Sequence, residues 1–238
     1  MVAWRTVRVC EVAEQIRGIT FGKADTVPIG GPGLIPVMTA TNVTESGLVP
    51  DSVLYLPVGR VSPRQRLQTN DVVVTASSGS LSVVGRAVAV EGDLDATFGA
   101  FCKVLRPSSN VDPRFFAHYF RTPSYRATVT RLAAGANINN LRNEDLDNLV
   151  LPLPPLAEQR RIASVLDEAQ VARRLRRQAI ELVALGIDSL FFDMTPSDAI
   201  SVPLGSVLKL SSGRFLPTKA MAGSGTVAVY GGNGVSGR

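Results

Sequence analysis

The stretch that most constrains the fold covers residues 151–193. It opens with three prolines, Pro152, Pro154 and Pro155, and then has no proline for 40 residues and a single glycine, Gly186. Proline disfavours helix in the residue before it but is tolerated in a first helical turn. The pattern therefore predicts a helix that starts at the proline step and continues without a break.

Apolar residues follow this stretch in steps of three and four, the spacing of one face of a helix. They are Ile162, Leu166, Ala169, Ala172, Leu175, Ala179, Leu182, Gly186 and Leu190. At 1.5 Å per residue the helix would be about 60 Å long. This length favours an arm that holds two domains apart and pairs with another helix as in a coiled coil. The alternative is an amphipathic helix packed against its own domain.

The composition narrows the class of protein. The 238 residues are 45% hydrophobic and 19% charged, which suits one or two domains with cores of their own. Cys10 and Cys102 form neither a disulfide framework nor a zinc pattern. No run of residues has the length of a membrane span or the pattern of a signal peptide. We therefore expect a cytoplasmic protein with no membrane association.

No group of residues predicts catalysis. The sequence has one histidine, no phosphate-binding Walker pattern, no Gly-x-Ser-x-Gly and no His–Glu metal spacing. It also lacks the Asn-Pro-Pro-type motif and the cofactor-binding glycine loop expected of an adenine methyltransferase. We expect no catalytic residue, no metal site and no cofactor bound by this chain.

The first 150 residues read as mostly β structure with a few helices. Strands are predicted at 34–43, at 71–75 and at 81–90, and a Ser/Gly loop joins the last two. Residues 98–101 and 103–105 are expected to form a strand pair, and 146–151 an exit strand. One helical turn is predicted at 11–16. Asp112 is expected to cap a helix whose aromatic residues lie in the core.

Basic residues in the predicted loops are candidates for DNA phosphate contacts. Arg60, Arg64 and Arg66 form the densest basic cluster of the first 150 residues, and Arg17 and Lys23 are isolated candidates. Ordinary solvated charge is the alternative for all five. The net charge of +5 allows an anionic partner without requiring one.

Small polar residues at the end of the strand 34–43 are candidates for reading base edges. They are Thr39, Thr41 and Asn42. Asparagine can pair with adenine, and threonine with several bases. The same residue types form turns through local hydrogen bonds to the backbone, so both interpretations stay open.

The proline step carries a resemblance to a known family. Pro152-Leu-Pro-Pro-Leu-Ala-Glu-Gln-Arg-Arg-Ile162, followed by a long helix, resembles the conserved-region signature of type I restriction–modification specificity (S) subunits. In that family a target recognition domain precedes a conserved helix, and a second domain and helix follow. Residues 227–237 resemble the start of a second recognition domain.

The resemblance extends to two loops. Asp71-Val-Val-Val, a Ser/Gly loop and Val84-Gly85-Arg86-Ala87 resemble the strand–loop–strand of S-subunit recognition domains, and the segment 133–141 resembles a loop before their exit strand. This implies that the polar side chains of both loops face DNA. These candidates are Ser77, Ser78, Ser80, Asn137, Asn139 and Asn140. Asparagine also favours left-handed turns, which is the alternative for the second loop.

The resemblance implies an α+β fold in three parts. Residues 1–150 would form a target recognition domain, 151–195 a long coiled-coil-type helix, and 196–238 the short β start of a second domain. The helix residues expected to pair with a partner are Leu156, Glu158, Gln159, Ile162, Leu166, Leu175, Leu182 and Leu190.

The implied function is non-catalytic reading of one half of a bipartite site in double-stranded DNA. Modification (methyltransferase) subunits would dock on the helix and bring S-adenosylmethionine. A restriction subunit, and a second S-type chain or half-subunit paired through the long helix, are further partners that the resemblance leaves open. The alternative is a non-catalytic protein-interaction scaffold that pairs through the helix.

Overall fold

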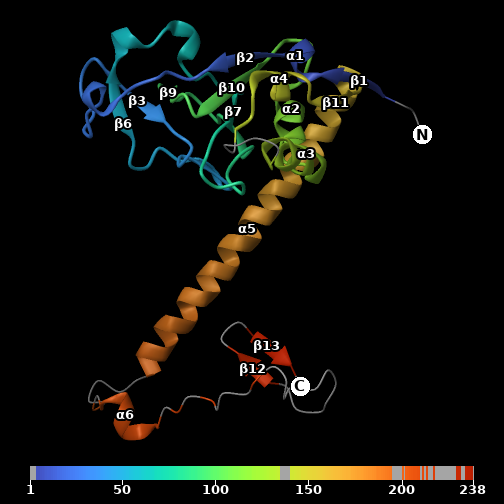
Figure 1. Ribbon diagram of the computed structural model, residues 1–238. Helices are drawn as coiled ribbons and strands as arrows, with labels where there is room; N and C mark the ends of the chain where they lie inside the picture. The colour runs from blue at the N-terminus through green and yellow to red at the C-terminus, as the bar shows by residue number, and fades with distance from the viewer. Residues whose placement is uncertain are drawn as a thin grey trace. The chain divides into compact units, whose positions relative to one another are not determined.

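The computed structural model describes residues 4–134, 140–194, 200, 202–209, 211, 213, 217, 229–231 and 234–237. The chain divides into two compact units, Met1–Gln178 and Ala179–Arg238 (Figure 1). The fold class is α+β, as predicted, with several small sheets and one long helix. The domain limits expected from the sequence, 1–150, 151–195 and 196–238, stay a prediction.

The first unit is built on a four-stranded antiparallel sheet in the order β2-β10-β7-β8. Its strands are β2 (Ala13–Arg17), β10 (Cys102–Pro107), β7 (Val72–Thr75) and β8 (Ala87–Ala89). Successive side chains of a strand point to opposite faces. Val72 and Val74 accordingly enter one core, and Val73 enters another. Both faces of β7 are buried, which explains its unbroken run of valines.

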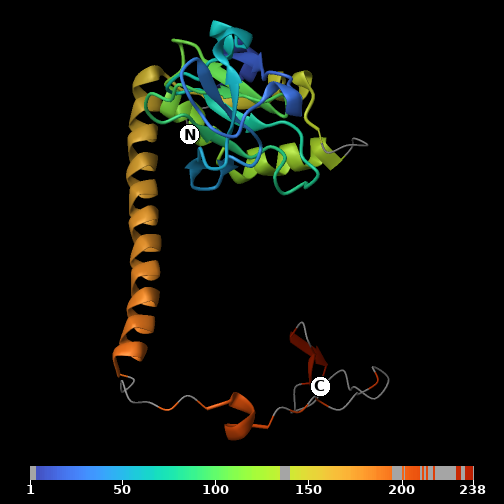
Figure 2. The same ribbon diagram turned by 90° about the vertical axis from the view of Figure 1, so that its left-hand side faces the viewer.

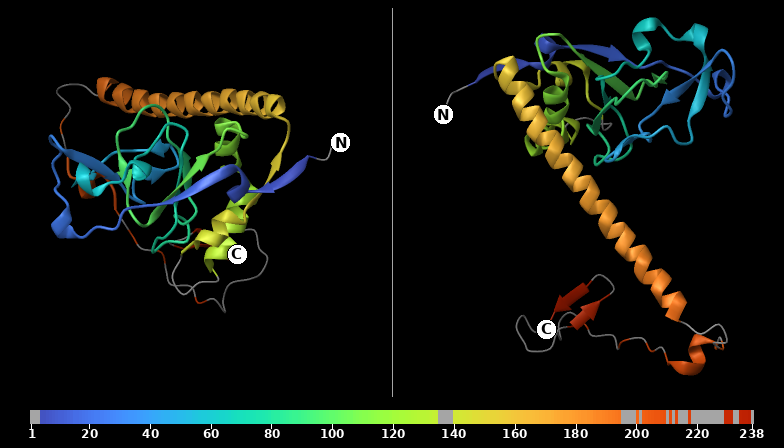
Figure 3. Two further views of the ribbon diagram at one scale, coloured as in Figure 1. Left: turned by 90° about the horizontal axis from the view of Figure 1, so that it is seen from above. Right: turned by 180° about the vertical axis from the view of Figure 1, so that it is seen from behind.

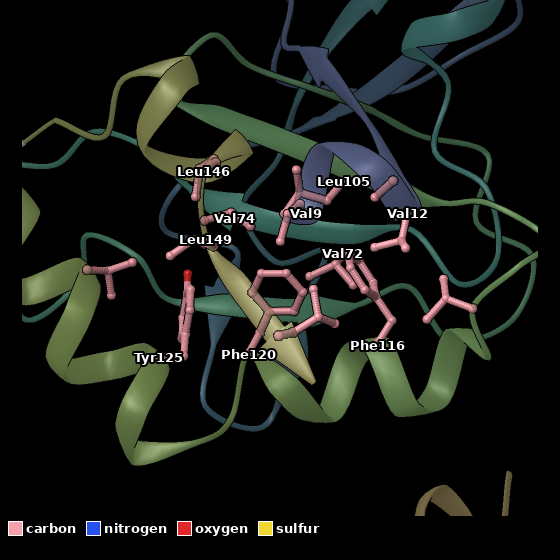
Figure 4. Close-up of a cluster of buried hydrophobic side chains, with 14 of the residues drawn as sticks. Val9, Val12, Val72, Val74, Leu105, Phe116, Phe120, Tyr125, Leu146 and Leu149 are labelled. Carbon is pink, nitrogen blue, oxygen red and sulfur yellow. The ribbon is translucent and has the colours of Figure 1, made fainter. Parts of the chain in front are cut away.

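Helices α2 (Pro113–Tyr119) and α3 (Pro123–Ala134) cover one face of this sheet. Figure 4 shows Phe116, Phe120 and Tyr125 directed from these helices toward the strands. The three rings are buried, and edge-to-face contacts link Phe120 to the other two. The aromatic core predicted from the sequence is confirmed. So is the cap, because a side-chain oxygen of Asp112 accepts from the backbone N–H groups of Arg114 and Phe115.

A three-stranded sheet in the order β6-β3-β9 covers the other core. Its strands are β3 (Leu34–Met38), β6 (Leu54–Pro57) and β9 (Thr97–Phe98), and the hairpin β4 (Val43–Thr44) and β5 (Gly47–Leu48) lies between the first two in sequence. Three short 3-10 helices are η1 (Lys23–Asp25), η2 (Val58–Arg60) and η3 (Pro63–Gln65).

The start and the end of the domain meet in one antiparallel strand pair. β1 (Arg5–Arg8) pairs with β11 (Val150–Leu153). Helix α1 (Val9–Val12) follows β1, and α4 (Asn143–Asp147) precedes β11. This pairing includes Pro152, and it places Pro154 and Pro155, which follow β11, at the edge of the core.

Helix α5 (Leu156–Met194) has 39 residues and is unbroken, as predicted. Figure 2 shows it as a continuous helix. Pro155 is not its first residue but its cap, and its carbonyl accepts from the N–H groups of Glu158 and Gln159. In the second unit the described residues include α6 (Leu204–Val207) and the antiparallel strands β12 (Val229–Gly231) and β13 (Gly234–Gly237).

Four local predictions for the β domain are wrong. Of the helical turn predicted at 11–16, Glu11 and Val12 belong to α1, but residues 13–16 lie in β2, because β10 offers a continuous pairing partner. β9 pairs with β3 and not with β10. Leu146 lies in α4 instead of the exit strand. Residues 81–85 form a turn, in which Gly85 has a φ of +72° and lies too close to Val129 for any side chain.

Candidate nucleic-acid interface

Three loops meet where β7 ends and β10 begins. The carbonyl of Phe101 accepts from the backbone N–H groups of Ala76 and Ser77 at 2.8 and 3.1 Å. The carbonyl of Ala76 accepts from the N–H of Leu141 at 2.8 Å, and Ser77 forms a β-bridge with Asn140. The structure therefore brings together the Ser/Gly loop, the β9–β10 turn and the end of the asparagine loop, which lie far apart in the sequence.

The threonine candidates border the same turn. The N–H of Gly99 donates to the carbonyl of Met38 at 2.8 Å, so the segment that begins at Thr39 lies against the β9–β10 turn. The hydroxyls of Thr39 and Thr41 are 2.9 Å apart. Thr39 is half-buried and Thr41 is exposed. Both threonines thus lie beside the loop cluster.

Asn42 is the exception among these candidates. It is 3% exposed, and its Oδ1 accepts from the N–H and hydroxyl of Thr39. Its Nδ2 donates to the carbonyls of Val49 and Asp51, both at 2.9 Å. All of its hydrogen-bonding capacity is used inside the fold. The base-reading interpretation of Asn42 is wrong, and the turn-forming alternative is right.

The serine candidates are partly exposed and make short local contacts. The N–H of Ser80 donates to the hydroxyl of Ser78 at 3.3 Å, and the hydroxyls of Ser80 and Ser82 are 2.8 Å apart. Ser80 and Asn140 are exposed, whereas Ser77 and Ser78 are half-buried. Asn137 and Asn139 lie outside the described residues.

Sequence reasoning missed Phe101. Its side chain is 67% exposed although its backbone is held by the two hydrogen bonds to the Ser/Gly loop. An exposed side chain of this size leaves a large apolar area in water, which is unfavourable. Only its place between two strand-like runs could have drawn attention to it, and that pattern is equally typical of a core residue.

Two basic side chains, Arg126 half-buried and Lys103 buried, hold the backbone of the loop cluster in place. Arg126 donates to the carbonyls of Val84 and Leu81, both at 2.7 Å, and so holds the turn after the serine loop. Lys103 is 8% exposed and donates to the carbonyl of Leu141 at 2.6 Å. Burial, together with the charge of Arg17, lowers the pKa of Lys103 to about 8, while Asp145 and Asp147 oppose that shift.

Each arginine of the predicted basic cluster has an acidic partner. Arg60 pairs with Asp25 and Arg64 with Glu14, and Arg66 contacts Asp95 at 3.2 Å. All three side chains remain more than a third exposed. The pKa of Asp25 is lowered, first by the N–H of Gly22 and then by Arg60. The cluster is therefore less positive than its sequence indicates.

The isolated basic candidates are exposed as well. Arg17 and Arg64 line one hollow together with Gln15, Ile16, Ser62, Gln65, Asn143 and Asp147. Lys23 lies in η1 and is exposed. The structure thus brings Arg17 and Arg64 together, and it places an acidic side chain beside them.

The motif at the start of α5 packs mainly against its own domain. Gln159 is 1% exposed, and Ile162 packs against the core that α2 and α3 cover. The pairing role predicted for Gln159 is therefore wrong, because no partner can reach it. Leu156 is 36% exposed, and Glu158 pairs with Arg161, which lowers the pKa of that carboxyl.

The apolar stripe beyond this point is open to solvent. Leu166, Leu175, Leu182 and Leu190 are 39%, 57%, 68% and 60% exposed. In the described part of the chain no group of three or more metal-binding side chains gathers, and no helix is both long and apolar enough to cross a bilayer.

The fold defines a class of protein, a β-rich domain that continues into a long helix. The family model for the type I restriction modification DNA specificity domain matches residues 1–182. The chain belongs to this family. That membership disfavours the scaffold alternative.

Two specificity subunits are similar to this chain in sequence. The chain is 35% identical over 164 residues to the type I restriction enzyme StySPI specificity subunit of Salmonella potsdam, and equally to the EcoKI specificity subunit of Escherichia coli K12. Each alignment covers 69% of this chain and 35% of the relative. The chain thus spans about a third of the length of these relatives.

Solved structures share the fold. A chain from a type I R-M system matches with a TM-score of 0.61 at 22% identity, covering 79% of this chain and 43% of that one. The HsdS subunit from Thermoanaerobacter tengcongensis matches with a TM-score of 0.56 at 24% identity, covering 74% and 40%.

Proposed function

We propose that this chain is the DNA-reading part of a type I restriction–modification specificity subunit, and that its first unit reads one half of a bipartite site in double-stranded DNA. Family membership supports this proposal most directly. The meeting of three loops from distant parts of the chain at one end of a sheet supplies the surface.

The loop cluster would read the bases. Hydroxyl and amide side chains pair with base edges in the major groove, and the exposed groups of Thr41, Ser80 and Asn140 are the best placed among the described residues. Thr39, Ser77 and Ser78 would act beside them. Asn137 and Asn139 stay candidates from the sequence alone.

Phe101 would add an apolar contact to this polar surface. Apolar side chains recognise the thymine methyl group. Because hydrogen bonds from Ala76 and Ser77 hold its carbonyl, the backbone at Phe101 would lose little conformational freedom on binding.

The basic side chains would hold the phosphate backbone. Arg17, Lys23, Arg60, Arg64 and Arg66 are all exposed. A phosphate would have to compete with the acidic partners of Arg60, Arg64 and Arg66. These three arginines would therefore orient the DNA more than they would add to the affinity.

The second half of α5 would carry partner contacts. Its exposed apolar residues are Val171, Leu175, Ile180, Leu182, Val183, Leu185, Ile187, Leu190 and Met194. A helix with this much exposed apolar surface is typical of one that packs against another chain. We infer that its partner is a modification subunit, with a restriction subunit or a second S-type chain as further candidates.

Catalysis would come from those partners. This chain would act in the cytoplasm without a cofactor, and S-adenosylmethionine would bind on the modification subunit. The test is to express the chain with its modification subunits and to map DNA methylation with and without it. A methylated bipartite sequence that depends on the chain is expected. Methylation that is unchanged without the chain would refute the proposal.

A further inference from the structure

The first turns of α5 lie against the first unit (Figure 3), and hydrogen bonds attach them at two separate points to α2 and its N-cap. The inner point is Gln159. Its Oε1 accepts from the N–H of Asp112, and its Nε2 donates to the carbonyl of Pro154, both at 2.8 Å. One amide thereby joins the proline step, the start of α5 and the N-cap of α2.

The outer point is His118, which is 8% exposed. Its Nε2 lies 2.8 Å from Oδ1 of Asp167, and its Nδ1 lies 3.3 Å from Nε2 of Gln170. The other oxygen of Asp167 accepts from Arg114 at 3.1 Å. A neutral imidazole with its proton on Nε2 satisfies both contacts, because it donates to the carboxylate and accepts from the amide.

The two points lie on one face of α5, with Ala163 fully buried between them. Their spacing of Gln159, Ala163, Asp167 and Gln170 follows the helical period. From Val171 onward every described side chain of α5 is exposed. Within the described residues, the contacts of His118 with Asp167 and Gln170 are the polar contacts between α2 and α5 that lie farthest along α5.

We propose that His118, Asp167 and Arg114 are positioning residues that set the direction in which α5 leaves the recognition domain. The expected consequence, that this direction sets the gap between the two half-sites, rests on the proposed function. Two contacts eight residues apart, about 12 Å along the helix, define its direction, whereas Gln159 and the buried Ala163 alone hold only about 6 Å of it.

Because α5 is long beyond Gln170, a small change in its direction moves its far end by a large distance. From Gln170 to Met194 the helix extends for about 36 Å. A tilt of roughly 10° moves its end by about 6 Å, which is close to two base-pair steps of DNA. Loss of the outer point would therefore broaden the range of gaps that the complex accepts, without changing the half-site that is read.

The chain offers a direct measurement of direction. Cys10 is exposed, whereas Cys102 is buried and its thiol has a pKa raised to about 12, so only Cys10 reacts with a spin label. A second label at Arg177→Cys reports on α5 just beyond the attachment, where Arg177 is exposed. Pulsed electron resonance then gives the distribution of distances between the two labels.

The double variant His118→Ala/Asp167→Ala is expected to give a distribution about twofold broader than the parent. Asp167→Asn keeps an oxygen for His118 and should restore the narrow distribution. Glu168→Ala removes the neighbouring exposed carboxylate and should change nothing. An unchanged width in the double variant would overturn the proposal.

Methylation supplies the second readout. With modification subunits present, the double variant should methylate the same half-site at several gaps, and the parent at one. A single unchanged gap would refute the consequence for DNA. If the parent methylates no bipartite site at all, the proposed function fails, while the distance measurement still decides whether His118 and Asp167 orient the helix.

Discussion

Asn42, Asp71 and Gln159 are polar side chains buried in the first unit, and each is hydrogen-bonded on more than one side. Asp71 binds Arg106 through two bonds of 2.8 Å and also accepts from the N–H of Gln68. A buried polar group without partners costs about 1–3 kcal/mol. These residues therefore join segments of the fold and have no free polar group to offer a ligand at the surface.

The buried residue Lys103 should make the free energy of unfolding depend on pH. Its pKa falls from 10.5 to about 8 on folding. Below about pH 8 the amine is charged in both states and its burial costs up to about 3 kcal/mol, while above about pH 10.5 it is neutral in both states and the cost is gone. The unfolding free energy of the parent should thus rise across this window relative to Lys103→Met.

Urea denaturation at several pH values measures the difference. Lys23→Met, at an exposed position, is the matched control and should follow the parent at every pH. Parallel curves for the parent and Lys103→Met from pH 7 to 11 would mean that the folded protein holds Lys103 at its ordinary pKa.

The arginine cluster supplies a second prediction at this scale. Alanine at Arg60, Arg64 and Arg66 should weaken binding to specific and unrelated DNA alike, because phosphate contacts do not depend on sequence. The slope of log affinity against log salt should fall by about one for each arginine that touches a phosphate. Titration of labelled duplexes at several salt concentrations measures both quantities.

Arg161→Ala is the matched control for this variant. Arg161 is also exposed and ion-paired, with Glu158, but it lies on α5. If the triple variant retains the salt slope of the parent, the three arginines bind only Asp25, Glu14 and Asp95 and have no part in DNA binding.

At the level of elements, the sequence predicted what depends on local pattern. The uninterrupted run after Pro155 indicated α5, and Asp112-Pro113 indicated the start of α2; both are confirmed. It could not predict β2, because a strand of mixed residues is specified by its partner β10, almost ninety residues away.

The same limit applies to the candidate site. Thr39, Ser77 and Asn140 look like ordinary loop residues until backbone hydrogen bonds bring their loops together. Asn42 and Gln159 have the residue types of a contact surface, but burial removes both of them from it. Residue type indicates what a side chain is able to do, and packing decides whether a partner reaches it.

The apolar stripe of α5 leads to the prediction at this scale. Leu182 is 68% exposed, so an aspartate there should leave the folded chain stable and weaken its pairing with another helix. Sedimentation with and without the modification subunit should show loss of the larger species. The urea midpoint should stay within the scatter of the parent.

Ala184→Asp is the control for this variant, since Ala184 is exposed and lies about 200° around the helix from Leu182. Assembly that withstands aspartate at Leu182 as well as at Ala184 would exclude the stripe as the pairing surface. Loss of assembly in both variants would mean that the contact surrounds the helix.

At the scale of the whole molecule, the proposed function makes α5 a spacer, and a spacer is tested by its length. A second copy of residues 172–178, inserted after Gln178, adds seven residues and keeps the apolar repeat in phase. The helix becomes about 10 Å longer, which corresponds to roughly 3 bp of DNA. The methylated site should keep its half-site sequence and gain up to about 3 bp in its gap.

A seven-residue Gly/Ser insertion at the same place adds the same number of residues without a rigid helix, and should abolish methylation or spread it over many gaps. A gap that is identical in the parent and in the helical insertion would show that α5 does not measure the distance between the half-sites.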